Sequence, residues 1–495
     1  MQDTVRLADG AVGHARPMYE VEQLIGGHWG AGGDGRLTVL DPADDTPVST
    51  VPIATPVEVD TAVMTARKAA TDWARTPAAE RGAALHHAAE AVAAAIDRLA
   101  EAQTAEMGRP IREARAGVAA GVATLRQYAE LGPVHRGKTL AGAHHATDLM
   151  TYEPRGVVAV ITPWNDPVAV SCGLLGAALV TGNTVVYKPS ERAPATGWLL
   201  TRILAEHLPD GVLSMVTGDG TVGAALAGHD VDVVAHVGAT ATGRAIAATC
   251  VRTGAKALLE NGGSDPLIVD DGVDPEWAAQ QAAQGAFANA GQLCVAVERI
   301  YVHRAIADAF LDALVRRATR LRVGPGRDPA TDLGPLVDRR HRDEVHAQVT
   351  DAVTRGARLL CGGVIPSGPG AFYPPTVLVD CTDDMPVMRE ETFGPVAPVM
   401  VVDSFDEALV RACRSPYGLA ATVLTPSMSH AQRAWRELPV GTVKINAVFG
   451  GAPGGAAHPR RGSGQGFGYG PDLLDEMTFT KVVHIEPPSG ARGHW

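Results

Sequence analysis

One stretch decides how the rest of the chain is understood, and it reads Phe287-Ala-Asn-Ala-Gly-Gln-Leu-Cys294-Val-Ala-Val-Glu-Arg-Ile-Tyr-Val302. An Ala-rich run predicts a helix from Glu276 to about Asn289 that ends at Gly291, and the Val- and Ile-rich run after it predicts a strand. Cys294 is therefore expected at a corner between two rigid elements. A catalytic nucleophile needs such a position, because a displacement of about 1 Å can lower a rate roughly 100-fold. A lone cysteine is also compatible with a small buried apolar residue, so the other motifs must decide.

Length and composition are those of a globular protein with two or three domains. Its 495 residues exceed what one core supports, and 46% of them are hydrophobic. The formal net charge is -12 and no basic block occurs, which argues against nucleic acid as a partner. The longest apolar run, Val168 to Val180, predicts a buried helix and is too short to span a bilayer, so no membrane association is expected.

The six cysteines indicate the compartment. They stand at positions 172, 250, 294, 361, 381 and 413, and none forms a C-x-x-C pair. Neither a zinc site nor a disulfide framework is therefore expected, and no metal is predicted. A reducing cytoplasm fits this pattern best. The polar start Met1-Gln-Asp-Thr-Val-Arg6 does not resemble a signal peptide.

The order of the predicted elements indicates an α/β fold. Residues 20 to 53 predict short strands, and a capping box at Thr55-Pro-Val-Glu58 opens an amphipathic helix. Two further helices are expected at about 78 to 105 and 109 to 131. From Met150 onward, β-branched runs alternate with Ala-rich helices, which is typical of a doubly wound parallel sheet. Its strands are predicted at Val157–Ile161, Thr184–Tyr187, Leu213–Val216, Val233–Val237 and Ala257–Leu259.

A second α/β series runs from about 266 to 475. Its predicted strands are Leu267–Val269, Ile300–His303, Thr376–Val379, Val396–Val402, Ala421–Leu424 and Thr442–Ile445. The apolar run Lys481–Glu486 falls outside this alternation of helices and strands. Together with Leu149–Tyr152 it predicts a small β-flap that pairs with another subunit.

The first motif, Thr162-Pro-Trp-Asn165-Asp-Pro167, directly follows the predicted strand Val157–Ile161. Ligands of a doubly wound sheet bind at the carboxyl ends of its strands. An amide donor such as Asn165 could hold a developing oxyanion there. The structural alternative is a Pro-bounded turn in which Asn serves as a turn former.

Three stretches bear on a nucleotide ligand. Gly182-Asn-Thr-Val-Val-Tyr-Lys188-Pro-Ser-Glu191 places a carboxylate at a strand end, where it can accept from both hydroxyls of a ribose; a surface ion pair is the alternative. Gly218-Asp-Gly-Thr-Val-Gly223 matches G-x-G-x-x-G without a clean acid about twenty residues on, and is interpreted as a tight turn near the cofactor. Gly238-Ala-Thr-Ala-Thr-Gly243 also follows a strand and opens a helix, whose free N–H groups suit a pyrophosphate better.

Two acidic motifs complete the set. Leu258-Leu-Glu260-Asn-Gly-Gly263 places an acid at a strand end, where it could activate water beside a nucleophile; a simple turn acid is the alternative. Glu390-Glu391-Thr-Phe393-Gly-Pro395 has adjacent acids, which repel each other unless one has a partner or a function; a solvated loop is the alternative.

Taken in order, five motifs resemble those of the aldehyde dehydrogenase superfamily, and the resemblance extends from about 20 to 487. The matching stretches are Pro163-Trp-Asn-Asp-Pro167, Lys188-Pro-Ser-Glu191, Leu259-Glu-Asn-Gly-Gly263, Gly291-Gln-Leu-Cys294 and Glu390-Glu-Thr-Phe-Gly-Pro395. The resemblance implies two doubly wound domains, a Rossmann-like dinucleotide-binding domain at 1–135 and 155–265 and a catalytic domain at 266–478. It also implies an oligomerisation flap at 136–154 and 479–495, in a homodimer or homotetramer.

The resemblance implies oxidation of an aldehyde to the carboxylic acid with NAD(P)+. The implied catalytic residues are the nucleophile Cys294, the base Glu260, the oxyanion donor Asn165, and Lys188. The implied cofactor-binding residues are Thr162, Pro163, Trp164, Lys188, Ser190, Glu191, Gly218, Gly238, Ala239, Gly243, Asn261, Glu391 and Phe393. Lys188 and Glu191 would bind the adenosine ribose, and the Glu191 carboxylate would favour NAD+, with NADP+ also possible.

Several positions depart from the family pattern. Ala239 stands where the family usually has Ser, Asn261 where it has Leu, and Ser463-Gly-Gln-Gly-Phe-Gly468 where it has Ser-Gly-x-Gly-Arg-Glu. Asp166 replaces an aromatic or apolar residue that would face the substrate tunnel, which suits a polar or cationic aldehyde. Arg460 and Arg461 near the tunnel mouth would instead favour an acidic one, and both substrate classes stay open.

Two alternative functions remain on the same fold. A CoA-acylating semialdehyde dehydrogenase is disfavoured by Glu260, because that branch commonly lacks this base. A catalytically silent relative is disfavoured because Cys294, Asn165 and Glu260 are all present.

Overall fold

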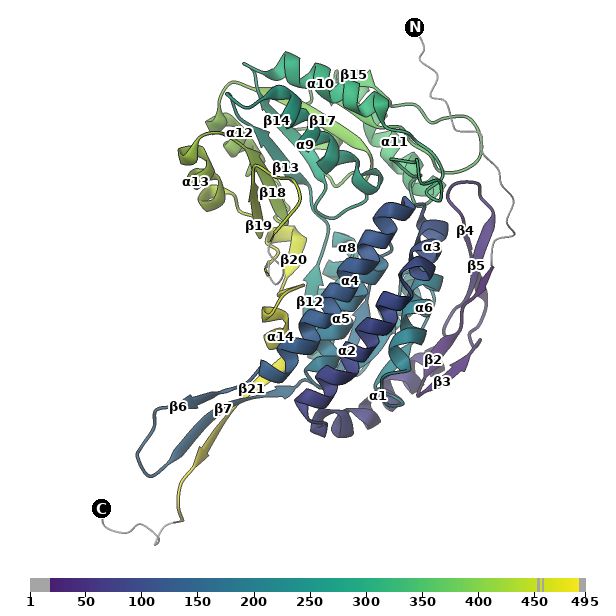
Figure 1. Cartoon of the computed structure of the whole chain (residues 1–495), viewed down its shortest axis with the longest axis vertical. Helices are drawn as coiled ribbons and strands as arrows, with labels where there is room; N and C mark the ends of the chain where they lie inside the picture. The colour runs from purple at the N-terminus through teal and green to yellow at the C-terminus, as the bar shows by residue number, and fades with distance from the viewer. Residues whose placement is uncertain (1–17, 452–454, 456–457, 489–495) are drawn as a thin grey trace.

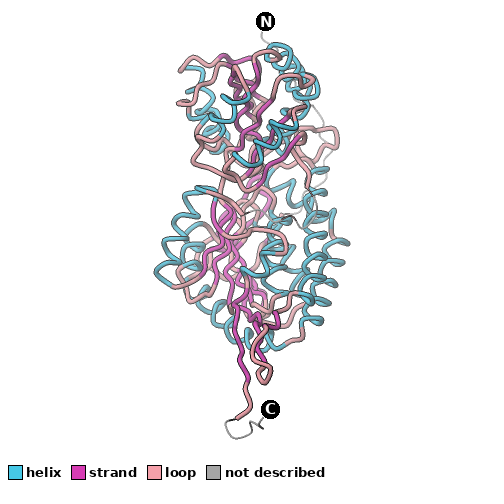
Figure 2. The backbone as a smooth tube through the Cα atoms, turned by 90° about the vertical axis from the view of Figure 1, so that its left-hand side faces the viewer, coloured by secondary structure: helices cyan, strands magenta, loops and turns pink. Residues whose placement is uncertain are grey.

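The molecule has two halves, each built around one large sheet, and a narrow third sheet projects from the end of the lower half (Figure 1). The computed structural model describes residues 18–451, 455 and 458–488, so the parts of the predicted ranges at 1–17 and 489–495 lie outside the described residues. In the side view, strands run through the middle of the molecule and helices lie on both sides of them (Figure 2). The predicted α/β class with two α/β halves and a β-flap is confirmed.

The first sheet has eight strands in the order β20-β12-β11-β8-β9-β10-β2-β3. Its five central strands are parallel, and along the chain they are added first on one side of β8 and then on the other. The winding therefore reverses between β8 and β11, which is where a doubly wound sheet binds its ligands. The bounds are β2 Gln23–Ile25, β3 His28–Gly30, β8 Val157–Ile161, β9 Thr184–Lys188, β10 Leu213–Met215, β11 Val233–Val237, β12 Lys256–Glu260 and β20 Gly464–Gln465.

Helices cover both faces of this sheet, which explains why β8 is apolar along its whole length. Val158 and Val160 belong to the core beneath α2 to α6, whereas Val157, Ala159 and Ile161 belong to the core beneath α1, α7 and α8. The helices are α1 Pro56–Arg75, α2 Ala78–Ala94, α3 Ile96–Met107, α4 Ile111–Leu131, α5 Pro167–Val180, α6 Pro194–Ala205, α7 Gly220–Ala227 and α8 Thr240–Thr253.

Two helix predictions have different outcomes. The capping box is confirmed, since the Thr55 side chain accepts from Glu58 N and the Glu58 side chain accepts from Thr55 N. The single helix expected at 78 to 105 is wrong, because Ala95 leaves the helical conformation at φ -102 and ψ 12 and separates α2 from α3. No Gly or Pro marks this break, so the packing of both helices against α4 and α6 decides it.

The second sheet has seven strands in the order β15-β16-β17-β14-β13-β18-β19. Its bounds are β13 Asp265–Val269, β14 Val297–His303, β15 Arg358–Cys361, β16 Thr376–Val379, β17 Val396–Val402, β18 Ala420–Leu424 and β19 Thr442–Ile445. Its helices are α9 Pro275–Phe287, α10 Ala307–Arg320, α11 Arg339–Thr354, α12 Phe405–Ala412 and α13 Met428–Glu437. The short 3-10 turns of both halves are η1 Gly132–Val134, η2 Ala288–Gly291, η3 Pro386–Met388 and η4 Arg461–Ser463.

The flap is built as predicted from segments far apart in the chain. β21 Thr478–Ile485 pairs antiparallel with β7 Thr147–Pro154, which also pairs with β6 Lys138–Leu140. β21 is an edge strand and exposes Phe479, Val482 and Ile485. A separate three-stranded sheet, β1 Tyr19–Glu20, β5 Pro47–Pro52 and β4 Arg36–Leu40, covers the α3 and α6 side of the first half.

The segment before the flap returns to the first sheet. β20 pairs antiparallel with β12, and α14 Asp472–Glu476 packs against α5. Leu473, Leu474 and Met477 lie in the core beneath α2 to α6. These residues therefore pack with the first sheet, whereas the expected boundary at 478 grouped them with the second. No helix of the described residues has the length and apolar character that crossing a membrane requires.

Candidate active site

Cys294 lies in the turn between η2 and β14, which is the predicted corner between a helix and a strand. The helix differs from the prediction, because α9 ends at Phe287 and η2 follows with Asn289 and Ala290 at φ 49 and 56. These left-handed conformations cost free energy for residues with a Cβ, although Asn tolerates them better than Ala. Such a conformation persists only where the surroundings hold it.

Contacts from three directions hold the turn before Cys294. Glu113 of α4 accepts a hydrogen bond from Asn289 N at 2.9 Å. The Gln292 side chain donates to Asn289 O at 3.0 Å and accepts from Val337 N at 2.9 Å. Gly291 approaches the chain so closely that a Cβ there would stand 2.1 Å from Gly394 O. The nucleophile is therefore positioned by parts of the chain that lie far from it in sequence.

Asn165 follows β8 and joins the first sheet to this turn. Its buried side chain donates to Gln292 O at 3.1 Å, and its own carbonyl accepts from Asn289 Nδ2 at 3.3 Å. The amide of Asn165 carries two hydrogens, and the hydrogen bond to Gln292 O uses one of them. The predicted pair of Asn165 and Cys294 is thus brought to one place.

Glu260 ends β12 and lies near the same thiol. The pKa of Cys294 is raised well above its usual value by burial first, and then by the charges of Glu260, Asp265 and Glu391. Burial also raises the pKa of Glu260, which moves this carboxyl group toward the range of a general base at neutral pH. Burial therefore favours the protonated form of both the Cys294 thiol and the Glu260 carboxyl group.

Glu260 has room for its side chain because residue 468 is a glycine. A Cβ at Gly468 would stand 2.5 Å from Glu260 Oε2. The loop that carries Gly468 is anchored without the usual Arg and Glu of the family pattern. Instead, Glu476 accepts from Phe467 N at 3.2 Å and His458 accepts from Gly466 N at 3.1 Å.

Lys188 ends β9 and belongs with the ribose-binding candidates. Its buried ammonium donates to Pro189 O at 3.0 Å and lies 3.8 Å from Glu191 Oε2. The Glu191 side chain is 41% exposed, and Ser190 Oγ accepts from Arg192 N at 3.2 Å. These contacts join Lys188 to Glu191, and both its cofactor-binding role and its catalytic role stay predictions.

The two Gly-rich turns differ at the helices that they open. At α7, the Asp219 carboxylate accepts from Thr221 N at 2.9 Å and caps the helix. At α8, the N-cap is Ala239, so no side chain caps the helix, and Thr240 Oγ1 is buried without a hydrogen-bond partner among the described residues. An anion therefore fits the N-terminus of α8 and not that of α7.

Asn261 ties three segments together. Its backbone N–H donates to Ser463 O at 2.8 Å, and its side chain donates to Gly462 O at 3.1 Å. A Cβ at Gly243 would overlap the Asn261 side chain, so the glycine lets α8 approach this turn. Gly238 and Gly218 also leave room for close neighbours, because a Cβ at these positions would meet the His236 ring and Val222 respectively. The contacts of Asn261 are those of a structural link, and its binding to a cofactor stays a prediction.

An aromatic cluster joins residues from the two halves of the molecule. Trp164 and Phe393 meet edge to face with ring centroids 5.6 Å apart, and His341 packs against both. His341 Nε2 lies 2.8 Å from Phe393 O, which supports the left-handed φ of 52 at Phe393. Glu391 accepts from Gly263 N at 2.9 Å, and burial raises its pKa to about 7.

Thr162 and Pro163 precede this cluster. Thr162 Oγ1 is buried and shares hydrogen bonds with Ser171 and Tyr187, each at 3.3 Å. The Thr162 side chain thus faces the interior, and any contact of this residue with a cofactor is left to its backbone. Pro163 is only partly buried and leads into Trp164.

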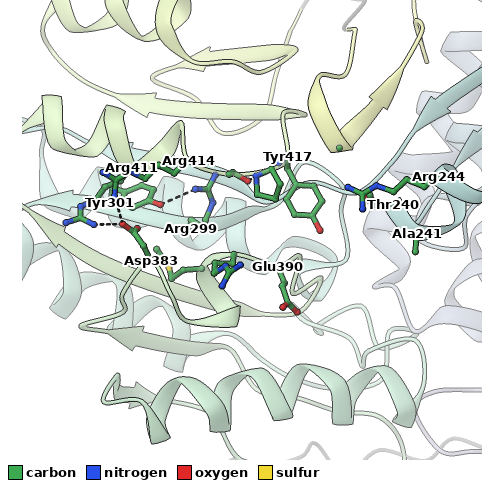
Figure 3. A pocket seen from close by; sticks show the side chains of 15 residues that line it. Thr240, Ala241, Arg244, Arg299, Tyr301, Asp383, Glu390, Arg411, Arg414 and Tyr417 are labelled. Carbon is green, nitrogen blue, oxygen red and sulfur yellow. Dashed lines mark hydrogen bonds and ion pairs between the residues drawn. The ribbon is translucent and has the colours of Figure 1, made fainter. Parts of the chain in front are cut away.

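A cavity of about 810 Å³ opens beside the first turn of α8 (Figure 3). Thr240, Ala241 and Arg244 line one end, and Glu390 and Tyr417 lie between this end and the other. The opposite end is lined by Arg299, Tyr301, Asp383, Arg411 and Arg414, which are joined by hydrogen bonds and ion pairs. Cys294 and Glu260 are not among the lining residues, so this cavity reaches the predicted anion site and not the nucleophile.

Two of the three polar residues expected near the substrate, Asp166 and Arg461, have partners in the protein. Asp166 lies 2.9 Å from Arg109, so its charge is balanced by a residue that the sequence motifs did not single out. Arg461 donates to Cys413 O at 2.8 Å and to Ser415 O at 2.6 Å. Arg109 and Glu113 were missed because they come from the α3–α4 connection and the first turn of α4, far from every motif in the sequence.

Comparisons with known proteins match nearly the whole chain. The model of the family described as "Aldehyde dehydrogenase family" matches residues 29–483. An NAD-dependent aldehyde dehydrogenase from Sinorhizobium meliloti is 31% identical, with a TM-score of 0.94 and 99% of each chain covered. Lactaldehyde dehydrogenase from Escherichia coli is 32% identical, with a TM-score of 0.92 and 95% and 100% of the two chains covered. Betaine aldehyde dehydrogenase from Staphylococcus aureus, in complex with NAD+, is 30% identical, with a TM-score of 0.91 and 95% and 97% covered.

Proposed function

The chain belongs to the aldehyde dehydrogenase family and is an oxidoreductase, and we propose that it oxidises an aldehyde to the carboxylic acid with NAD+ by way of a Cys294 thioester. The observation that supports this most is the meeting of Cys294, Asn165 and Glu260 where the two sheets come together. Asn165 contacts the turn before Cys294 directly, and the pKa of the Cys294 thiol is raised by burial and then by the charge of Glu260.

In the proposed reaction, Cys294 Sγ gives its proton to water and forms a bond to the carbonyl carbon of the aldehyde. The free N–H of the Asn165 amide and the Cys294 backbone N–H hold the oxyanion. NAD+, when bound, supplies the acceptor for the hydride, and a thioester on Cys294 remains. Glu260 then takes a proton from water, which attacks the thioester; the C–S bond breaks, and the acid leaves.

The described residues fit a dinucleotide. The uncapped N-terminus of α8, with its unpartnered Thr240 hydroxyl, would hold the pyrophosphate. Glu191 and Lys188 would hold the adenosine ribose, and Glu391 and Phe393 would hold the nicotinamide side. NAD+ is preferred in this proposal because the 2'-phosphate of NADP+ would lie against the Glu191 carboxylate. NADP+ remains possible because Glu191 is partly exposed and can turn away.

Hydrolysis is favoured over transfer to CoA because Glu260 is present and close to Cys294. The experiment that separates these outcomes is NADH formation over a panel of aldehydes, with and without CoA. We expect the free carboxylic acid as the product in both cases. Acyl-CoA as the main product would replace hydrolysis with CoA acylation, and no NADH with any aldehyde would favour a silent relative.

We further propose a cytoplasmic homodimer or homotetramer joined through the flap. The free edge of β21 and its exposed Phe479, Val482 and Ile485 support this, because an apolar edge strand pairs readily with another chain. The six cysteines are all unpaired, which suits a reducing compartment. Light scattering of the full chain and of Val482→Lys tests the assembly; a monomeric wild type would contradict it.

A further inference from the structure

A buried carboxylate on β14, close after Cys294 in the chain, has no part in the proposed reaction. Glu298 is 5% exposed, and each of its oxygens accepts a hydrogen bond from the backbone. Oε2 accepts from Thr392 N at 3.0 Å, and Oε1 accepts from Phe393 N at 2.8 Å. Burial and then the charge of Glu391 raise the pKa of Glu298, whereas these two hydrogen bonds lower it. The two backbone donors therefore favour the charged form of this side chain.

The turn that Glu298 holds carries two residues proposed to bind the cofactor. Glu391 and Phe393 are partly exposed, whereas Thr392 between them is buried. Two backbone N–H groups of the turn thus point into the protein at Glu298, while the side chains on either side of Thr392 reach its surface. Phe393 has a φ of 52, a left-handed conformation that persists only where the surroundings hold it.

The same turn begins at the edge of the cavity in Figure 3. Glu390, the residue before Glu391, lines this cavity, and so do Thr240 and Ala241 in the first turn of α8. A dinucleotide whose pyrophosphate lies at α8 therefore has open space between that helix and the start of the turn.

Helix α11 holds the turn from another side, through different groups. Gln348 Oε1 accepts from the Thr392 hydroxyl at 2.9 Å, and His341 Nε2 lies 2.8 Å from Phe393 O. These contacts use a hydroxyl and a carbonyl, whereas Glu298 is the partner of the two backbone N–H groups. Buried backbone N–H groups nearly always have a partner. Without the Glu298 carboxylate, the turn would have to shift or leave these donors unsatisfied.

We propose that Glu298 is a positioning residue for the cofactor, which fixes the turn so that Glu391 and Phe393 meet the nicotinamide half of NAD+. This inference rests on the proposed function, which assigns Glu391 and Phe393 to that half. Glu298 acts through the turn and does not touch the cofactor itself. The adenosine half, at Glu191 and the N-terminus of α8, is held by the first sheet and does not depend on Glu298.

The first test compares the binding of NAD+ and ADP by calorimetry, because ADP lacks the nicotinamide half. Glu298→Gln keeps the size of the side chain and replaces one oxygen by an NH2 group, which cannot accept from a backbone N–H. The Kd of NAD+ is expected to rise about 10-fold, since hydrogen bonds to charged groups contribute at least this factor. The Kd of ADP is expected to stay as in wild type. An unchanged Kd for NAD+, or an equal rise for both ligands, overturns the proposal.

Glu106 provides the matched control on the adenosine side. It is 1% exposed, and its oxygens accept from Ala195 N at 2.8 Å and from Thr196 N at 2.9 Å, at the start of α6. Glu106→Gln therefore breaks the same kind of contact away from the turn. The ratio of the two Kd values is expected to stay as in wild type even if the melting temperature falls. A selective loss of NAD+ affinity in Glu106→Gln would assign the effect to general destabilisation and overturn the role of Glu298.

A second variant decides the question if a thermal melt shows that Glu298→Gln does not fold. Gln348→Ala loosens the same turn from α11, at a side chain that is only partly buried. The ratio of the Kd of NAD+ to that of ADP is expected to rise about 3-fold, the size expected for a neutral hydrogen bond. An unchanged ratio in this variant would then overturn the proposal.

The two proposals fail in distinguishable ways. A folded wild type that binds neither NAD+ nor ADP contradicts the proposed function, and this inference with it. Wild-type binding of both ligands, with the same ratio of Kd values in a folded Glu298→Gln, contradicts only the positioning role of Glu298.

Discussion

The two sheets supply different kinds of residue to the site. The first supplies side chains at the ends of regular parallel strands, such as Asn165 after β8, Glu191 after β9 and Glu260 on β12. The second supplies Cys294 and Phe393 from turns with left-handed residues. A strand end is placed by the hydrogen bonds of its own sheet, whereas a strained turn needs contacts from other segments. Those come from both halves, such as Glu113 in the first and Val337 and His341 in the second. Changes on the two sides should therefore have different consequences.

The largest effect is expected on the side of the second sheet, at the nucleophile. Cys294→Ala should abolish NADH formation, because no thioester can form, while NAD+ binding and the melting temperature stay near wild type. The measurement is steady-state NADH formation together with calorimetry for NAD+. Cys413→Ser is the matched control, on a cysteine that is also partly buried, and should keep most of the activity. Substantial turnover in Cys294→Ala would falsify the assignment.

A smaller effect is expected from the first sheet, at the base. Glu260→Gln should still release a first equivalent of NADH and then turn over about 100- to 10,000-fold more slowly, since general-base catalysis contributes a factor of this size. Stopped-flow measurement separates the burst from the steady rate. A normal steady rate would show that another group activates water, and loss of the burst would show that Glu260 is needed before the thioester forms.

The two Gly-rich turns of the first sheet open helices that differ in their caps, and one substitution can remove this difference. Ala239→Asp gives α8 the kind of carboxylate cap that α7 already has in Asp219. The helix should gain about 1 kcal/mol of stability, whereas NAD+ binding should weaken at least ~10-fold because the new charge lies where the pyrophosphate is expected. Ala239→Asn is the control, since it caps without a charge. Unchanged NAD+ affinity in Ala239→Asp would place the pyrophosphate elsewhere.

The smallest effect is expected at the ribose site. Glu191→Gln should narrow the preference for NAD+ over NADP+ in kcat/KM, mainly by weakening NAD+. Charges about 4 Å apart repel by roughly 4 kcal/mol at an effective dielectric constant of 20, but the exposure of Glu191 lets it turn away, so a moderate preference is expected. A wild type that prefers NADP+ would show that Lys188 and Ser190 outweigh the carboxylate.

The sequence predicted the residues at strand ends well for a physical reason. Apolar runs such as Val157–Ile161 predict a buried parallel strand, and the polar residue that follows such a strand must lie at the carboxyl edge of the sheet. The sequence pattern alone predicts Asn165, Lys188 and Glu260 at strand ends in this way. The corner at Cys294 was also predicted, because a change from a helical to a strand pattern is visible along the chain.

Other features depend on contacts that no local pattern contains. The break at Ala95 has no Gly or Pro to mark it, and the pairing of β20 with β12 joins residues about 200 positions apart. The left-handed Asn289 and Ala290 require Glu113 and Gln292 as partners. The sequence gives no partner for the charge of Asp166, and only the fold brings Arg109 to it.

By itself, then, the sequence determined which side chains the chain carries and at which strand ends they stand, since periodicity and turn chemistry act over a few residues. The tertiary structure decided how those side chains are held and balanced. The pKa of Cys294 and the partner of Asp166 arise from burial and from charges on distant segments, and these exist only once those segments have packed together.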